Sequence, residues 1–284
     1  MADLDTYLEE WEPGPVTDTD SLDPERSQAL AAVLETPRQL FGETELAPLW
    51  HWVYFQEWPP HSALGSDGHP TEGHFLPPIP DRRRMFAGGR LNITQPLQLG
   101  QPAERTSSLA QVVVKQGRSG EMVFVTVRSE FRQGGALRVV EEQDYVYRSG
   151  ESTTKNPHSE RPRQVPESTS EWQLEFTGDP VRLFRFSALT ANAHRIHYDE
   201  PYAREVESYP GLVVHGPILA MLMTELARRS RTTGRVATVD YRLRAPVFAG
   251  EPVLVTGEPE TDSARMAVVT APDAVMAQAE VGFE

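Results

Sequence analysis

A short segment near the middle of the chain recurs 150 residues further on, and this recurrence restricts the fold more than any other feature. Residues 91–102 read LNITQPLQLGQP and residues 241–252 read YRLRAPVFAGEP. The residues that interrupt regular structure coincide in the two copies: Pro96 with Pro246, Gly100 with Gly250, and Pro102 with Pro252. Three coincident breakers in alternating, strand-like sequence indicate an internal duplication. We therefore expect two similar halves that pack together as a pseudo-dimer.

Both copies lie in sequence that is typical of antiparallel strands. β-Branched runs separated by glycine turns fill residues 85–148, and comparable runs return from Val236 to the end of the chain. An apolar helix is predicted from Pro217 to about Arg231, because its apolar side chains recur at helical spacing. The predicted fold class is α+β, with two antiparallel sheets that each wrap a helix.

The boundary between the halves is predicted in a polar stretch. Residues 149–171 are rich in Ser, Thr, Glu, Pro and Arg and nearly free of apolar side chains, which is typical of a linker. Residues 1–148 would then form the N-terminal half, which carries an acidic N-terminal arm and a proline-rich loop. Residues 172–284 would form the C-terminal half.

Three local patterns predict individual elements. Asp23 followed by Pro24 is typical of a helix start, and the helix would run to Leu34. The aromatic residues of 50–58 predict a buried strand, since aromatic side chains favour strands. Residues 183–186, Leu-Phe-Arg-Phe, are also strand-like.

Composition excludes several classes of function. The chain of 284 residues has a formal net charge of −14, so we expect no nucleic acid partner, which would need a basic face. The absence of cysteine excludes disulfides, thiolate metal sites and cysteine nucleophiles, and fits a reducing compartment. No apolar run follows the acidic N-terminal residues, so we expect no signal peptide, no membrane association and a cytoplasmic location.

A long proline-rich loop is predicted at residues 59–84. The spacings of its histidines, His61, His69 and His74, match no helical or zinc-knuckle pattern, so we expect no metal site. Long ordered loops often cover active sites, although a surface excursion without a role fits the sequence equally well. The loop ends in three arginines that would either bind a phosphate or carboxylate or form a solvated turn: Arg82, Arg83 and Arg84.

Groups capable of proton transfer are concentrated in residues 190–199. They are Asn192, His194, His197 and Asp199, of which Asp199 precedes a Glu-Pro pair and is expected to cap a helix. His215 and Gly216 follow shortly afterwards and directly precede the apolar helix. A histidine close to a helix N-terminus indicates a site where a carbonyl is polarised and a proton is moved.

These segments resemble the MaoC-like, hot-dog-fold (R)-specific enoyl-CoA hydratases. Residues 186–197, FSALTANAHRIH, are similar to their motif Ser/Thr-Gly-Asp-x-Asn-Pro-Ile/Leu-His, and residues 244–251, RAPVFAGE, resemble the strand after their central helix. From about Trp50 onward the chain resembles a double hot-dog subgroup that contains mesaconyl-C4-CoA and itaconyl-CoA hydratases and type 2 hydroxyacyl-thioester dehydratases. Residues 75–89 and 212–217 carry that likeness.

The resemblance implies roles for individual residues. His197 falls on the catalytic histidine, and Gly216 on the glycine whose backbone N–H forms the oxyanion hole. Asn192 stands where the broad motif has a catalytic aspartate, and His194 where it has asparagine. Since an amide side chain cannot exchange protons, His197 would carry the acid/base work alone, while Asn192 orients the water.

The resemblance also implies a substrate. We expect reversible hydration of an α,β-unsaturated acyl-CoA, preferably a C5 dicarboxylic one such as mesaconyl- or itaconyl-CoA, without a cofactor beyond the coenzyme A of the substrate. The residues expected to contact substrate are His194, Arg82, Arg83, Arg84, Arg90 and His215. The alternatives are a 3-hydroxyacyl-ACP dehydratase of fatty-acid or polyketide synthesis and a non-catalytic acyl-thioester-binding subunit. The sequence leaves room for a homodimer.

Overall fold

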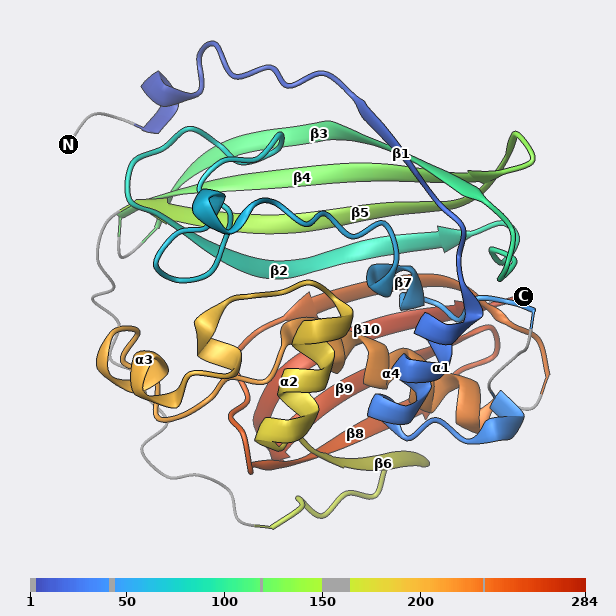
Figure 1. Ribbon diagram of the computed structural model, residues 1–284. Coiled ribbons are helices and arrows are strands. Elements are labelled where there is room, and N and C mark those ends of the chain that lie inside the picture. The colour runs from blue at the N-terminus through green and yellow to red at the C-terminus, as the bar shows by residue number, and fades with distance from the viewer. Residues whose placement is uncertain (1–3, 41–43, 118–119, 150–163, 232) are drawn as a thin grey trace.

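The fold is one antiparallel sheet of ten strands (Figure 1). The computed structural model describes residues 4–40, 44–117, 120–149, 164–231 and 233–284. The strands of the N-terminal half are β1 (Val16–Asp20), β2 (Arg82–Ile93), β3 (Ala103–Gly117), β4 (Gly120–Gln133) and β5 (Ala136–Ser149). Those of the C-terminal half are β6 (Trp172–Thr177), β7 (Val236–Leu243), β8 (Pro252–Pro259), β9 (Ser263–Ala271) and β10 (Ala274–Phe283).

Four α-helices and five 3₁₀ turns complete the elements of the described residues. The α-helices are α1 (Pro24–Leu34), α2 (Pro180–Leu189), α3 (Glu200–Glu205) and α4 (Gly216–Ser230). The 3₁₀ turns are η1 (Leu4–Tyr7), η2 (Arg38–Leu40), η3 (Trp50–Val53), η4 (His61–Ala63) and η5 (Arg195–His197). None of the helices in the described part of the chain has the length and apolar run that a membrane span requires.

The strand order is symmetric about the centre of the sheet. The N-terminal half has the order β1-β3-β4-β5-β2, and the C-terminal half has the mirrored order β7-β10-β9-β8-β6. β2 and β7 join the halves by antiparallel pairing, from Gly88 opposite Arg242 to Asn92 opposite Thr238. The predicted α+β fold of two packed hot-dog halves is confirmed, and the two predicted sheets are continuous. The expectation that each sheet wraps a helix holds for the C-terminal half, whereas in the described part of the N-terminal half α1 contacts α2 and η3 instead.

The structure also places the two copies of the sequence repeat in equivalent positions. In each copy a central strand ends, an isolated bridge follows, and a turn with a glycine at positive φ leads into the next strand. The φ angle is 71° at Gly100 and 82° at Gly250, a conformation that glycine adopts without strain. Matching hydrogen bonds hold both bends: Leu46 N to Leu97 O and Val214 N to Val247 O, each 2.8 Å.

α1 and α2 are the corresponding first helices of the two halves. The side chain of Asp23 caps α1 and that of Asp179 caps α2, and a proline follows each cap. The two helices contact each other. The strand predicted at residues 183–186 is therefore wrong: these residues belong to α2. The Asp-Pro signal that predicted α1 correctly was also present here.

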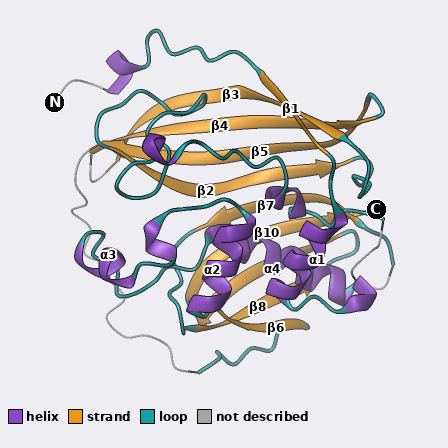
Figure 2. Ribbon diagram, in the orientation of Figure 1, coloured by secondary structure: helices purple, strands orange, loops and turns teal. Residues whose placement is uncertain are grey.

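The two halves differ in the element that packs on the inner face of the sheet. α4 contacts β6, β7, β8, β9 and β10, and its apolar side chains form the core of the C-terminal half. The strand predicted at residues 50–58 is wrong, because this segment forms only the single turn η3. Figure 2 shows loops rather than a long helix in front of β2 to β5.

The predicted linker lies mostly outside the described residues. β5 ends at Ser149 and β6 begins at Trp172, but residues 150–163 are not described. The division into 1–148, 149–171 and 172–284 therefore stays a prediction.

Candidate active site

His197 is the last residue of η5 and is buried, with 6% of its surface exposed. Its Nδ1 lies 2.7 Å from the carbonyl oxygen of Val213. A carbonyl can only accept, so Nδ1 carries the proton and Nε2 is left with a free lone pair. Val213 N in turn donates to the carbonyl of Ile196, which fixes η5 against the segment that leads into α4.

His215 supports His197 from within the core. The two rings stack with centroids 3.6 Å apart and an angle of 17° between their planes. His215 is fully buried, and its Nε2 lies 2.9 Å from Ser187 Oγ in α2. The His215 ring is enclosed between Ser187 and His197; its contact with substrate stays a prediction, which this buried position does not favour.

Gly216 begins α4 directly after His215. The first N–H groups of a helix have no partner inside the helix and lie at its positive end. A Cβ atom at Gly216 would lie 2.4 Å from Leu243 Cδ1 and 3.9 Å from Phe86 Cδ1. Glycine therefore allows apolar side chains from both halves to approach this backbone N–H.

Asn192 and His194 take part in the turn that precedes η5. Asn192 Oδ1 accepts a hydrogen bond of 3.0 Å from the backbone N–H of His194. The His194 ring lies edge-on to His197, with centroids 5.6 Å apart. The structure thus brings the three predicted residues of this motif together. Asp199 caps α3, as predicted.

Burial keeps these histidines neutral. It lowers the pKa of His197 to about 4, although the hydrogen bond to Val213 opposes the change. Burial, together with the charges of His69, His197 and Arg84, lowers the pKa of His194 to about 2. His197 is therefore a neutral base throughout the physiological pH range.

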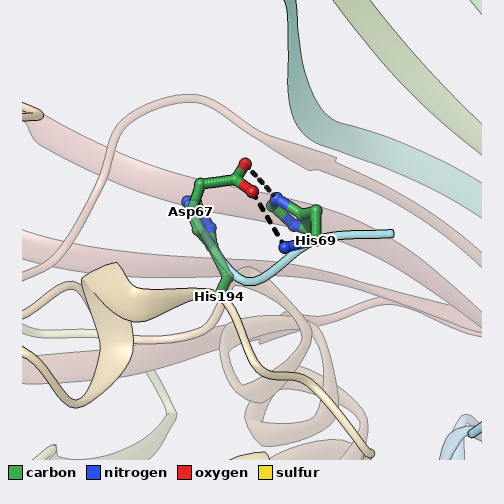
Figure 3. Close-up of side chains that lie close together, drawn as sticks. All are labelled: Asp67, His69 and His194. Carbon is green, nitrogen blue, oxygen red and sulfur yellow. Dashed lines mark hydrogen bonds and ion pairs between the residues drawn. The ribbon is translucent and has the colours of Figure 1, made fainter. Parts of the chain in front are cut away.

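The proline-rich loop reaches across to this site from the N-terminal half. The backbone N–H of Arg195 donates to Asp67 O at 2.9 Å, and its guanidinium donates to Ser66 O at 3.0 Å. The His69 ring packs on the His194 ring, with centroids 4.1 Å apart, and His69 Nδ1 lies 2.9 Å from Asp67 Oδ2 (Figure 3). The sequence patterns pointed to His69 only as a possible metal ligand, and they did not single out Asp67. No signal in the sequence linked this loop to residues 193–195.

Asp67, His69 and His194 are also a set that a divalent cation could bind. One donor atom of each lies within 4.8 Å of the others. Two features oppose a cation: the carboxylate of Asp67 is already hydrogen-bonded to His69, and the guanidinium of Arg84 is close enough to lower the pKa of both histidines. That no metal is bound stays a prediction.

The three loop arginines, which lie at the start of β2 rather than in a turn, have different partners. Arg82 donates to the carbonyls of Pro77 and Thr71, so it holds the loop. Arg83 forms an ion pair with Glu207.

Arg84 is exposed and lies over the Tyr145 ring at 5.3 Å. Among the described residues no carboxylate pairs with it. Of the three arginines, Arg84 is the one whose charge remains available to a ligand near the histidines.

Arg90 lies elsewhere. Its guanidinium pairs with Glu142 and with Asp144, at 3.0 Å each. It lines a hollow of about 400 Å³ at the β2–β7 seam, and its neighbour Leu91 points into the core on the opposite face of the sheet. The structure therefore does not bring Arg90 to the histidines.

The fold and the site define a hot-dog protein of the MaoC-like class. The crystal structure of a MaoC-like dehydratase from Phytophthora capsici superposes with a TM-score of 0.69 at 16% identity, covering 100% of this chain and 98% of that one. The family model of hydroxyacyl-thioester dehydratase type 2 matches residues 49–249. The chain belongs to this family.

Two characterised relatives support the assignment. The chain is 46% identical over 235 residues to mesaconyl-C(4)-CoA hydratase of Chloroflexus aurantiacus, a match that covers 82% of each chain. It is 27% identical over 238 residues to the mitochondrial hydroxyacyl-thioester dehydratase type 2 of Schizosaccharomyces pombe, covering 75% of this chain and 77% of that protein. The family resemblance predicted from the motifs is confirmed.

Proposed function

We propose that the protein is a hydro-lyase that reversibly hydrates an α,β-unsaturated acyl-CoA, with a C5 dicarboxylic thioester, mesaconyl-C4-CoA or itaconyl-CoA, as its substrate. The observation that carries this proposal is the position of His197. Its Nδ1 is bound to Val213, three residues before Gly216, so a free imidazole nitrogen lies beside the start of α4. The name of the 46% identical relative supports the same chemistry.

In the hydration direction, His197 Nε2 removes a proton from water as the water oxygen bonds to the β-carbon. Electron density moves to the thioester oxygen, which becomes an enolate. His197 then returns the proton to the α-carbon, so the net change is the addition of H and OH across the double bond. Dehydration follows the same steps in reverse.

The enolate oxygen is stabilised by the Gly216 N–H. This donor lies at the positive end of α4, and the side chains of Leu243 and Phe86 lie close to the Cα of Gly216. Charge that develops next to a fixed donor in an apolar environment is stabilised far more than in water.

Arg84 is the proposed partner of the anionic part of the substrate. Its guanidinium can bind the distal carboxylate of the acyl group or a phosphate of coenzyme A. In a chain with net charge −14, a cation without a carboxylate partner is a local attraction for an anionic ligand.

Turnover of purified protein tests the proposal. Hydration of mesaconyl-C4-CoA removes the conjugated thioester absorbance. We expect a higher kcat/KM for mesaconyl-C4-CoA than for crotonyl-CoA, whose acyl group has no free carboxylate. If crotonyl-CoA and mesaconyl-C4-CoA are hydrated equally well, the dicarboxylic assignment is wrong. If no enoyl-thioester changes absorbance, the non-catalytic alternative replaces the proposal.

The carrier-protein alternative is tested in the same assay with enoyl-ACP. Acyl carrier proteins are acidic, and a chain of net charge −14 disfavours their approach unless it offers a basic docking surface. We therefore expect the CoA thioester to be preferred. The proposal also includes a cytoplasmic location, a homodimer and activity without a further cofactor. Light scattering tests the homodimer, and elemental analysis tests for a bound metal.

A further inference from the structure

The C-terminal motif has an amide, Asn192, where the broad family motif has a carboxylate. A water molecule that attacks a double bond has two O–H groups, and His197 takes only one proton. The broad motif has an aspartate at the position of Asn192, but Asn192 Oδ1 here accepts a hydrogen bond from His194 N. One lone pair of this amide oxygen is thereby engaged, and a neutral amide accepts more weakly than the carboxylate of the broad motif, so a second acceptor would help to hold the water.

His69 has the geometry of such an acceptor. Its Nδ1 is 2.9 Å from Asp67 Oδ2, and a carboxylate can only accept, so Nδ1 carries the proton. The lone pair of His69 is therefore on Nε2. His197 has the same tautomer, with its proton on Nδ1. The same Asp67 carboxylate accepts from the backbone N–H of His69 at 2.9 Å, which fixes the ring relative to its own main chain.

The loop that carries His69 is docked rigidly on the motif. Gly68 has a φ of 91°, and a Cβ atom there would lie 1.9 Å from Ala193 O, so only glycine allows this approach. Arg195 binds the backbone of Asp67 and of Ser66. The His69 ring then packs on the His194 ring, which in turn lies edge-on to His197, and the charge of His69 is close enough to act on the pKa of His197.

We propose that His69, oriented by Asp67, is a second catalytic residue, whose Nε2 accepts a hydrogen bond from the attacking water. The N-terminal half would thus replace the carboxylate that the C-terminal motif lacks. The inference rests on the proposed function. One water O–H bond breaks and its proton passes through His197 to the α-carbon, while His69 holds the other hydrogen, which remains in the product hydroxyl.

The electrostatic surroundings suit a neutral acceptor. Burial and the charge of Arg84 lower the pKa of His69, while Asp67 and Glu207 oppose this change, and His194 is itself neutral. Protonation of His69 removes the lone pair, so activity should fall on the acidic side as His69 gains a proton.

Three variants test the role. His69→Ala should lower kcat about 10–100-fold, the value of one or two hydrogen bonds to a reacting group. His69→Gln keeps an acceptor oxygen that does not titrate, so it should recover part of the lost kcat and remove one ionisation from the acidic limb of kcat/KM. Asp67→Asn removes a charge that favours protonated His69, so this limb should move to lower pH. His61→Gln, an exposed histidine of the same loop, is the matched control and should leave kcat unchanged.

The outcomes separate this inference from the proposed function. If His197→Ala abolishes turnover while His69→Ala keeps the wild-type kcat, His69 has no catalytic role and the proposed function stands. If His69→Gln is no more active than His69→Ala and both share the wild-type pH profile, the acceptor role is also refuted. A stoichiometric divalent metal that is present in the wild type and lost in His69→Gln would overturn the assignment in favour of a cation site. Far-UV circular dichroism confirms that each variant is folded.

Discussion

The two halves share their topology, but among the described residues only the C-terminal half has a long helix inside its sheet. The hydrogen bonds that pair Leu46 with Leu97 and Val214 with Val247 are equivalent, so the two residues that follow each bond can be compared directly. Two positions after Val214 comes Gly216, at the start of α4, whereas two positions after Leu46 comes Pro48. Proline has no N–H and cannot donate a hydrogen bond. The N-terminal half therefore has no backbone donor at the position that corresponds to Gly216, the residue proposed to form the oxyanion hole.

The two halves also differ in the length of their strands and in the element at their centre. The N-terminal half has longer strands, such as the 15 residues of β3 against the 8 of β8, and η3 in place of a central helix. Residues 65–69, which follow η3 along the chain, contact residues 193–195 of the C-terminal half. In the proposed site, the C-terminal half provides the backbone donor of Gly216, and the N-terminal half provides side chains of the loop that contacts His194.

The largest expected effect comes from the C-terminal histidine. His197→Ala should lower kcat about 10²–10⁴-fold, since it removes the group that moves the proton. Asn192→Ala should cost less, because Asn192 only orients the site. Steady-state hydration of the enoyl-CoA measures both, and near wild-type turnover of His197→Ala would disprove the assignment and direct attention to His194.

Exchanging the two equivalent residues tests the oxyanion hole. Gly216→Pro removes the N–H and should lower kcat about 10²–10³-fold, the typical cost of one oxyanion donor. Gly216→Ala retains the N–H but adds the Cβ that meets Leu243, so it measures the steric part alone. Pro48→Gly in the other half should leave turnover unchanged. Equal losses for the two Gly216 variants would show that space, not the N–H, is what matters.

A smaller effect is expected on stability. Because the folded-state pKa of His197 is about 4 and that of an unfolded histidine is near 6.5, the unfolded chain binds more protons between these values. The contribution of His197 to the free energy of unfolding is therefore fully present above about pH 6.5, and it is lost as the pH falls toward 4. His197 alone should contribute a loss on the order of 2 kcal/mol between pH 7 and 5. Urea denaturation at a series of pH values should show a weaker pH dependence of the free energy of unfolding for His197→Gln than for wild type, and an unchanged dependence would contradict the prediction.

The smallest effect concerns the arginine of the N-terminal half. Arg84→Ala should raise the KM for mesaconyl-C4-CoA about tenfold, or about 1.4 kcal/mol, by loss of one charge-assisted contact. Arg90→Ala is the control, because Arg90 is already paired with Glu142 and Asp144. If Arg84→Ala raises the KM for crotonyl-CoA equally, the contact is with coenzyme A and not with the acyl carboxylate.

Much of the fold followed from patterns that are local in sequence. The repeat predicted two equivalent halves because proline and glycine restrict the backbone wherever they occur. The strand predicted at 50–58 failed because aromatic residues favour burial in any conformation, and η3 buries Trp50 and Val53 without pairing as a strand. In the site, the motif located His197 and Gly216, but the contact of His69 with His194 depends on a loop path that no local preference specifies.

The β2–β7 seam has a consequence for how the protein behaves at low concentration. Two separate hot-dog chains that met along such strands would dissociate on dilution, and each would then lose the loop that the other provides. Here both partners belong to one chain, so their association is intramolecular and does not depend on concentration. In a homodimer every substitution occurs in both subunits, because the subunits share one sequence. In a single chain of two halves, a substitution changes one half alone. Pro48 and Gly216 could therefore diverge at equivalent positions, each suited to one side of a single active site.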